Sequence, residues 1–130
     1  MKRPPIGQRN TRQRDAIAEV IGAAAGPLTA PEIAERAQRE IPGLGMATVY
    51  RTLKLLQEAG RVRTVILPSG ETRYESEGLG HHHHFHCRVC DGVYDLESCH
   101  VVMPPGARTE EGFVVEDHEL TLYGVCPSCG

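Results

Sequence analysis

Two pairs of cysteines, each with two residues between its members, carry the clearest chemistry in this sequence. They are Cys87-Arg88-Val89-Cys90 and Cys126-Pro127-Ser128-Cys129. This spacing lets both sulfurs of a pair face one ion from a tight turn, and four thiolates close the tetrahedron that structural Zn²⁺ prefers. The second pair ends one residue before the last residue of the chain, so the ion would tie this end back onto its domain. We therefore expect Cys87, Cys90, Cys126 and Cys129 to bind a structural zinc ion.

A run of four histidines precedes the first cysteine pair. Successive side chains on an extended strand point to opposite faces. His82 and His84 therefore share one face, and His81 and His83 share the other, so that one short run can supply two different sites. We interpret a saturated cysteine site beside an exchangeable histidine site as the mark of a protein that senses metal.

The face that carries His82 and His84 has carboxylates as candidate partners. Asp95, together with either Glu75 or Glu77, can complete a site of two histidines and two carboxylates. Such mixed nitrogen and oxygen ligands suit Zn²⁺, Fe²⁺ or Mn²⁺ without selecting sharply among them.

The face that carries His81 and His83 has His118 as a further candidate ligand. The fourth ligand is open among Glu97, Cys99 and His100. Cys99 belongs to neither cysteine pair, and we interpret it as a packed thiol rather than a ligand. The alternatives are that the histidine run binds metal adventitiously at the surface and that His118 is only a hydrogen-bonding residue.

Composition and charge bound the class of protein. Of 130 residues, 40% are hydrophobic and 24% are charged, as in soluble globular proteins. The sequence shows no apolar run that would span a membrane and no signal peptide, which predicts a cytoplasmic protein whose paired cysteines bind metal rather than form disulfides.

The two halves of the sequence differ in charge. Residues 1–63 hold 11 Lys and Arg against 6 Asp and Glu, whereas residues 64–130 hold 3 Lys and Arg against 11 Asp and Glu. The basic half is expected to meet a polyanion and the acidic half to bind cations.

The basic half reads as three helices followed by a hairpin. Thr11 is the expected N-cap of the first helix, and Thr29 to Glu32 form a capping box that opens the second. In the third helix Met46, Val49, Leu53 and Leu56 recur along one face. Strands are expected at 62–67 and 72–75, with a turn at 68–70. This is the element order of a winged helix-turn-helix.

A helix-turn-helix places its recognition helix in the DNA major groove. The third helix exposes Tyr50, Arg51 and Lys54 opposite its apolar face, with Thr48 near its start. We expect these four residues to contact double-stranded DNA. The basic arm and Arg61 or Arg63 near the hairpin would bind the phosphate backbone. The arm comprises Lys2, Arg3, Arg9, Arg12 and Arg14.

The acidic half begins after a glycine-containing segment at 77–80 that reads as a hinge. Short strands are expected near 82–87, 93–96, 113–116 and 120–123. The division predicted by the sequence is therefore 1–76, a hinge at 77–80, and 81–130.

Together these residues resemble the Fur family of metal-dependent transcriptional repressors, which includes the ferric, zinc and manganese uptake regulators and the peroxide regulator. The resemblance covers residues 8–130. Four motifs carry it: Thr11-Arg12-Gln13-Arg14, Ala47-Thr48-Val49-Tyr50-Arg51-Thr52-Leu53, His81 to His84 before Cys87-x-x-Cys90, and His118 before Cys126-x-x-Cys129.

The resemblance implies a homodimer with an α+β fold. An N-terminal winged helix-turn-helix domain would bind DNA, and a small α/β dimerisation domain with a structural zinc site would follow. The family's regulatory metal site maps to Glu75 (or Glu77), His82, His84 and Asp95. A further site maps to His81, His83 and His118, and the DNA-contacting pair of the family maps to Tyr50 and Arg51.

Three departures from the family pattern leave the regulatory metal open among Zn²⁺, Mn²⁺ and Fe²⁺. Some members place a histidine ligand where this chain has Gly26-Pro27-Leu28, and zinc-uptake members often place a cysteine at the position of Glu77. Pro104-Pro105 interrupts the helix that is expected after Asp95.

The sequence therefore predicts a metal-responsive transcriptional repressor of metal uptake or homeostasis genes, which binds a double-stranded DNA operator as a homodimer. The alternative is a peroxide- or oxidation-sensing repressor of the same family. No membrane partner and no small organic substrate are expected. Zinc deaminases pair Cys-x-x-Cys with an upstream His-x-Glu, which this sequence lacks, so no enzymatic activity is expected.

Overall fold

The computed structural model describes residues 6–99, 101 and 103–130, and the chain divides into two units between Leu79 and Gly80. Lys2 and Arg3 of the expected basic arm lie outside the described residues, as does His100. In the part of the chain that is described, no helix combines the length and the apolar character needed to cross a membrane.

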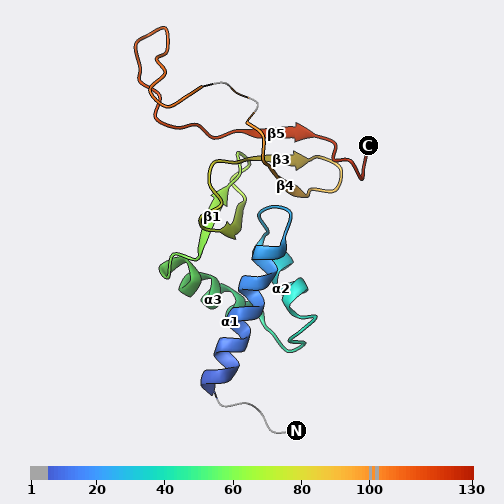
Figure 1. The fold of residues 1–130 in the computed structure, drawn as a ribbon. Helices are drawn as coiled ribbons and strands as arrows, with labels where there is room; N and C mark the ends of the chain where they lie inside the picture. Colours follow the sequence, from blue (N-terminus) through green and yellow to red (C-terminus); the bar gives the residue numbers. More distant parts are fainter. Residues whose placement is uncertain (1–5, 100, 102) are drawn as a thin grey trace. The chain divides into compact units, whose positions relative to one another are not determined.

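The first unit consists of three helices followed by a two-stranded antiparallel hairpin (Figure 1). The elements are α1 (Ile6–Ala23), α2 (Ala30–Ala37), α3 (Met46–Glu58), β1 (Val62–Ile66) and β2 (Thr72–Ser76). The hairpin register runs from Val62 opposite Ser76 to Ile66 opposite Thr72. This arrangement confirms the winged helix-turn-helix predicted from the sequence.

The apolar face of α3 packs into the core of this unit. Val49, Leu53 and Leu56 are at most 1% exposed, as the periodicity predicts. Met46, which was expected on the same face, is 37% exposed. It is the first residue of the helix, and because helical side chains point back toward the N-terminus, its side chain lies beyond the edge of the core.

The sequence predicted the start of α2 correctly but not the start of α1. The prediction of Thr11 as an N-cap was wrong, because α1 begins at Ile6 and contains Thr11. No proline occurs between Pro5 and Pro27 to interrupt the helix. The capping box of α2 is confirmed: Thr29 Oγ1 accepts from the Glu32 N–H, and the Thr29 N–H donates to Glu32 Oε1.

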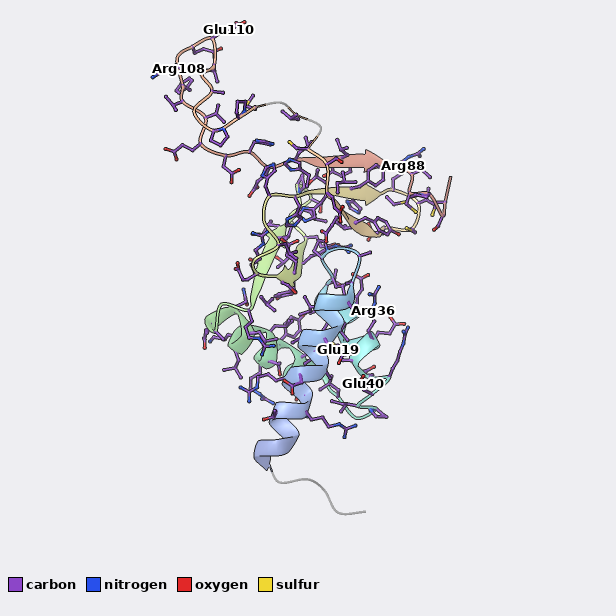
Figure 2. The ribbon with its side chains drawn as sticks, in the orientation of Figure 1. Glu19, Arg36, Glu40, Arg88, Arg108 and Glu110 are labelled. Atoms are coloured by element: carbon purple, nitrogen blue, oxygen red, sulfur yellow. The ribbon has the colours of Figure 1, made fainter. Side chains whose placement is uncertain are left out.

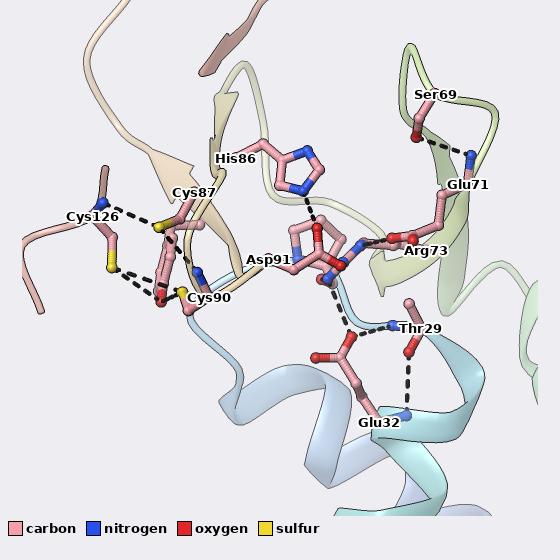
Figure 3. Close-up of polar contacts among 12 residues, drawn as sticks. Thr29, Glu32, Ser69, Glu71, Arg73, His86, Cys87, Cys90, Asp91 and Cys126 are labelled. Atoms are coloured by element: carbon pink, nitrogen blue, oxygen red, sulfur yellow. Dashed lines mark hydrogen bonds and ion pairs between the residues drawn. The ribbon is translucent and has the colours of Figure 1, made fainter. Parts of the chain in front are cut away.

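A buried arginine ties the hairpin to the start of α2. Arg73 in β2 is 2% exposed, and its guanidinium lies 3.1 Å from Glu32 Oε1 and 2.5 Å from Glu71 Oε1 (Figure 3). A buried charge is stable only when it is paired and hydrogen-bonded. The ion pair with Glu32 therefore fixes the hairpin on the helices of its own unit, while the pair with Glu71 lies within the hairpin.

The second unit contains a three-stranded sheet in the order β4-β3-β5. Its strands are β3 (His83–Cys87), β4 (Val93–Leu96) and β5 (Thr121–Gly124). The central strand β3 is antiparallel to β4 and parallel to β5. This topology places His83 and His84, the last two residues of the histidine run, on the central strand, between two neighbours that both bring side chains to it.

The long connection between β4 and β5 contains no helix among its described residues, although the family resemblance implies one there. Pro104-Pro105 and Gly106, which has a φ of 90°, are incompatible with a helix at this point. The strand expected at 113–116 is reduced to a single bridge between Arg108 and Val114. Arg108 and Glu110 extend into solvent from this connection (Figure 2). Helices in one unit and a sheet in each still give the predicted α+β class.

Candidate metal centres and nucleic-acid interface

The two cysteine pairs come together in the second unit. One ligand atom from each of Cys87, Cys90, Cys126 and Cys129 lies within 4.8 Å of the others. Figure 3 shows three of these residues, Cys87, Cys90 and Cys126, and the sulfurs of Cys90 and Cys126 are 3.9 Å apart. Tetrahedral zinc with bonds of about 2.3 Å separates its sulfur ligands by about 3.8 Å. The four thiols therefore fit a closed structural zinc site, as the spacing predicts.

The backbone of both cysteine turns is organised around Cys87. Its Sγ accepts hydrogen bonds from the N–H groups of Cys90 at 3.5 Å and Cys126 at 3.4 Å. These two hydrogen bonds lower the pKa of the Cys87 thiol to about 6, and the bond from Cys90 has the larger effect. Because zinc binds the thiolate and not the thiol, the turn prepares this residue to be a ligand.

A tyrosine that sequence reasoning missed supports the same site. The hydroxyl of Tyr94 lies 3.6 Å from Cys90 Sγ and donates to Cys126 Sγ at 3.8 Å. The hydrogen bond to Cys90, followed by the one to Cys126, raises the pKa of Tyr94, so the phenol keeps its proton. A side chain at Gly92 would meet this hydroxyl at 2.8 Å. No spacing rule marks a tyrosine on the neighbouring strand as a partner of the sulfurs.

Replacing Tyr94 with phenylalanine is expected to weaken zinc retention by about 10–100-fold, because partners of metal ligands typically contribute this much to affinity. Competition with a chromophoric chelator measures the effect. Tyr123→Phe is the matched control, since Tyr123 is 56% exposed and its ring lies beside His86. Equal zinc affinity in the Tyr94→Phe variant and in the unaltered protein would contradict the role of the hydroxyl.

His82 and His84 converge on Asp95 within the second unit. His84 lies opposite Asp95 in the β3–β4 register, and the Nε2 atoms of His84 and His82 lie 3.5 and 3.8 Å from Asp95 Oδ1. The two imidazole centroids are 4.9 Å apart. His82 Nδ1 lies 3.0 Å from the carbonyl oxygen of Gly80, which orients the ring with Nε2 toward the carboxylate. Two nitrogens and one carboxylate are thus assembled for a divalent cation.

The carboxylates expected to complete this set belong to the first unit. Glu75 on β2 is 3% exposed and lies opposite Arg63 on β1, whose guanidinium reaches Glu75 Oε2 at 2.6 Å. The alternative, Glu77, is exposed. Neither the ion pair of Glu75 nor the exposure of Glu77 shows which of the two carboxylates binds metal, so the assignment of Glu75 as a ligand stays a prediction.

The opposite face of the histidine run holds a second cluster. His81, His83, His118 and Cys99 each offer a ligand atom within 4.8 Å of the others. Burial, followed by the charges of the neighbouring histidines, lowers the pKa of His83, so its imidazole is neutral at neutral pH, which is the form that binds metal.

The interpretation of Cys99 as a packed thiol was wrong. Cys99 is exposed, and its Sγ lies 3.3 Å from the Nε2 atoms of both His83 and His118. Glu97, an alternative fourth ligand, is exposed and does not belong to this group. The sequence placed Cys99 among the candidates but gave no reason to prefer it.

The exposed side of α3 carries the residues predicted to meet DNA. Tyr50 is 52% exposed, Arg51 and Lys54 are exposed, and Arg51 donates to Thr48 Oγ1 at 3.2 Å. Arg12 on α1 is exposed and donates to the carbonyl oxygen of Glu40 at 3.2 Å. These residues are available for contacts with phosphates and bases, and their roles stay predictions.

Comparisons with known proteins agree with this architecture. The family model described as the ferric uptake regulator family matches residues 5–123. The ferric uptake regulation protein of Synechococcus elongatus is 34% identical over 128 residues, covering 95% of this chain and 86% of that protein. The zinc uptake regulation protein of Mycobacterium tuberculosis is 32% identical over 124 residues, covering 95% of both chains.

A solved structure also resembles this chain. A zinc-bound manganese uptake regulator superposes with a TM-score of 0.69 at 27% identity, covering 88% of this chain and 87% of that one. The names of these three proteins refer to iron, zinc and manganese, so similarity alone does not select the metal. The match along nearly the whole length shows that this chain belongs to the ferric uptake regulator family.

Proposed function

We propose that this protein is a metal-responsive DNA-binding transcriptional repressor of genes for metal uptake or homeostasis. The observation that carries the proposal is the set of His82, His84 and Asp95, which offers a divalent cation two nitrogens and a carboxylate beside a separate four-cysteine site. Four thiolates suit a structural zinc ion, whereas a mixed set of imidazole nitrogens and carboxylate oxygens binds divalent cations less selectively and can report metal supply.

The proposed response couples the two units. We infer that Glu75 supplies a further carboxylate across the segment 77–80, so that binding of Zn²⁺, Mn²⁺ or Fe²⁺ restrains the winged helix relative to the second unit. The second unit would hold two copies of the chain together as a homodimer in the cytoplasm. Two restrained recognition helices would then match two half-sites of an operator. By linkage, DNA raises metal affinity by the same factor by which metal raises DNA affinity.

The recognition surface is the exposed face of α3. We propose that Thr48, Tyr50, Arg51 and Lys54 contact the operator and that Arg12 contacts its backbone. The exposure of Tyr50, Arg51 and Lys54 supports this assignment. Contacts of Arg12, Arg51 and Lys54 with DNA phosphates would make the DNA affinity dependent on salt. Affinities must therefore be compared at one salt concentration.

The test is DNA-binding anisotropy on the fragment upstream of the protein's own gene, at fixed salt, across buffered concentrations of Zn²⁺, Mn²⁺ and Fe²⁺. One metal is expected to raise the affinity by about 5–150-fold, the usual range of coupling between sites. An affinity that is unchanged by every metal while the four-cysteine zinc is present would overturn the proposal. The oxidation-sensing alternative predicts instead a mass gain on histidines after treatment with iron and peroxide.

A further inference from the structure

We propose that Cys99 is the fourth ligand of a metal site with His81, His83 and His118, and that its sulfur makes this site prefer Zn²⁺ over Mn²⁺ and Fe²⁺. The site is separate from the set of His82, His84 and Asp95. The chain would thus carry two exchangeable sites of different ligand chemistry on opposite faces of one strand.

Three donor atoms of the cluster already have the spacing of a coordination shell. The Nε2 atoms of His83 and His118 are 3.2 Å apart, and each lies 3.3 Å from Cys99 Sγ. Bonds of about 2.0–2.1 Å to nitrogen and 2.3 Å to sulfur in a tetrahedron separate two nitrogens by about 3.3 Å and nitrogen from sulfur by about 3.6 Å. The observed triangle agrees with these edges to within a few tenths of an ångström.

His83 is the buried anchor of the cluster. It is 1% exposed, its Nδ1 has no hydrogen-bond partner among the described residues, and its Nε2 faces the other two donors. Burying polar atoms is unfavourable unless they gain partners. A cation would bind the lone pair of His83 Nε2, which faces Cys99 Sγ and His118 Nε2.

The sheet brings the other ligands to the same end of β3. His83 lies opposite Leu96 at the end of β4, and Cys99 follows three residues later. On the other side β5 runs parallel to β3, with the N–H of His84 donating to the carbonyl of Leu120 at 3.2 Å. His118 precedes this contact by two residues. Both neighbours of the central strand therefore deliver a ligand to one point.

His81 completes the tetrahedron from the solvent side. Its ring centroid lies 4.5 Å from that of His83 and 4.8 Å from that of His118, and its side chain is 46% exposed. A cavity of about 610 Å³ opens beside it, with Cys99, Met103 and Asp117 in its lining. An ion can enter and leave through this opening.

The Cys99 thiol donates to the carbonyl oxygen of Val101 at 3.0 Å. Metal binding would release that proton, since the ligand is the thiolate.

Ligand chemistry decides which ion the cluster selects. Thiolate is a soft ligand that suits zinc, whereas carboxylates suit Mn²⁺. The set around Asp95 contains a carboxylate and no sulfur, while the cluster of Cys99 contains a sulfur and no carboxylate. The two faces of the histidine run would therefore respond to different ions.

The test is Co²⁺ titration of the full-length reduced protein after its four-cysteine site has been loaded with zinc. We expect one equivalent of Co²⁺ to produce a thiolate-to-cobalt charge-transfer band, which Zn²⁺ abolishes at equimolar competition and Mn²⁺ does not. Zinc content is measured in the same samples, so that cobalt in the four-cysteine site is recognised and excluded from the count. The charge-transfer band is measured without DNA, so its result is independent of whether the protein is a repressor.

Three variants sharpen the assignment. Cys99→Ser removes an exposed side chain, so the fold is expected to persist, while the band disappears and Co²⁺ affinity of this site falls at least about 10-fold. Cys99→Asp keeps four ligands and should bind Co²⁺ without the band, with a smaller preference for Zn²⁺ over Mn²⁺. His84→Ala, on the other face, should retain the band. A band that persists in Cys99→Ser, or that never forms in the zinc-loaded protein, would overturn the proposal.

Discussion

Replacing Cys87 with serine is expected to release the structural zinc ion and to unfold the second unit. Cys87 is fully buried, accepts two backbone hydrogen bonds and contributes one of the four sulfurs. Structural zinc in small domains contributes about 10–16 kcal/mol of apparent binding free energy, whereas whole domains are stable by only about 5–15 kcal/mol. A sheet of three short strands is not expected to remain folded without this contribution.

Zinc content and thermal unfolding measure this effect. The Cys87→Ser variant is expected to lose one zinc ion per chain and the thermal transition of the second unit. Cys99→Ser is the matched control for the thermal transition, because Cys99 is exposed and is not part of the four-cysteine group. Any zinc that this variant loses is assigned to the cluster of His81, His83 and His118. A Cys87→Ser protein that keeps both its zinc and its melting temperature would refute the structural role.

Replacing His84 with alanine is expected to abolish the proposed rise in DNA affinity on metal binding. His84 Nε2 lies 3.5 Å from Asp95 Oδ1, and the ring centroids of His84 and His82 are 4.9 Å apart. The variant therefore leaves only His82 and Asp95 as ligands from this set in the second unit. With metal affinity lost, the coupling of about 5–150-fold is lost with it. The variant should bind DNA at the metal-free affinity at every metal concentration.

His86→Ala provides a control on the same strand and the same face. His86 Nε2 lies 2.6 Å from Asp91 Oδ1, and His86 belongs to neither histidine cluster. We expect this variant to keep its metal response, and both variants to keep the structural zinc. Loss of the response in both variants alike, or its survival in His84→Ala, would mean that this set does not regulate DNA binding.

Much of the fold could be predicted because its signals are local. The capping box at Thr29 and Glu32 fixes the start of α2, and the spacing of Val49, Leu53 and Leu56 defines the buried face of α3. The turn at 68–70 sets the hairpin. Alternation along the histidine run likewise separates His82 and His84 from His81 and His83.

Predictions failed where a local signal was incomplete. Thr11 resembles a cap, but the residues before it continue the helix, so α1 begins at Ile6. Apolar residues at Phe113 and Val114 suggested a strand, yet they are 70% and 52% exposed and pair only within their own loop. Strand formation depends on a partner strand, which sequence composition alone does not supply.

The sequence by itself determined the two cysteine pairs as zinc ligands, the two faces of the histidine run and the element order of the winged helix, because each of these signals is a spacing or a turn within a short segment. Only the tertiary structure showed that Tyr94 hydrogen-bonds to the sulfurs, that Glu75 pairs with Arg63, and that Cys99 meets His83 and His118. These contacts join residues on different strands and loops. Strand register and the path of the loop between β4 and β5 set their distances, and neither follows from residue types along the chain.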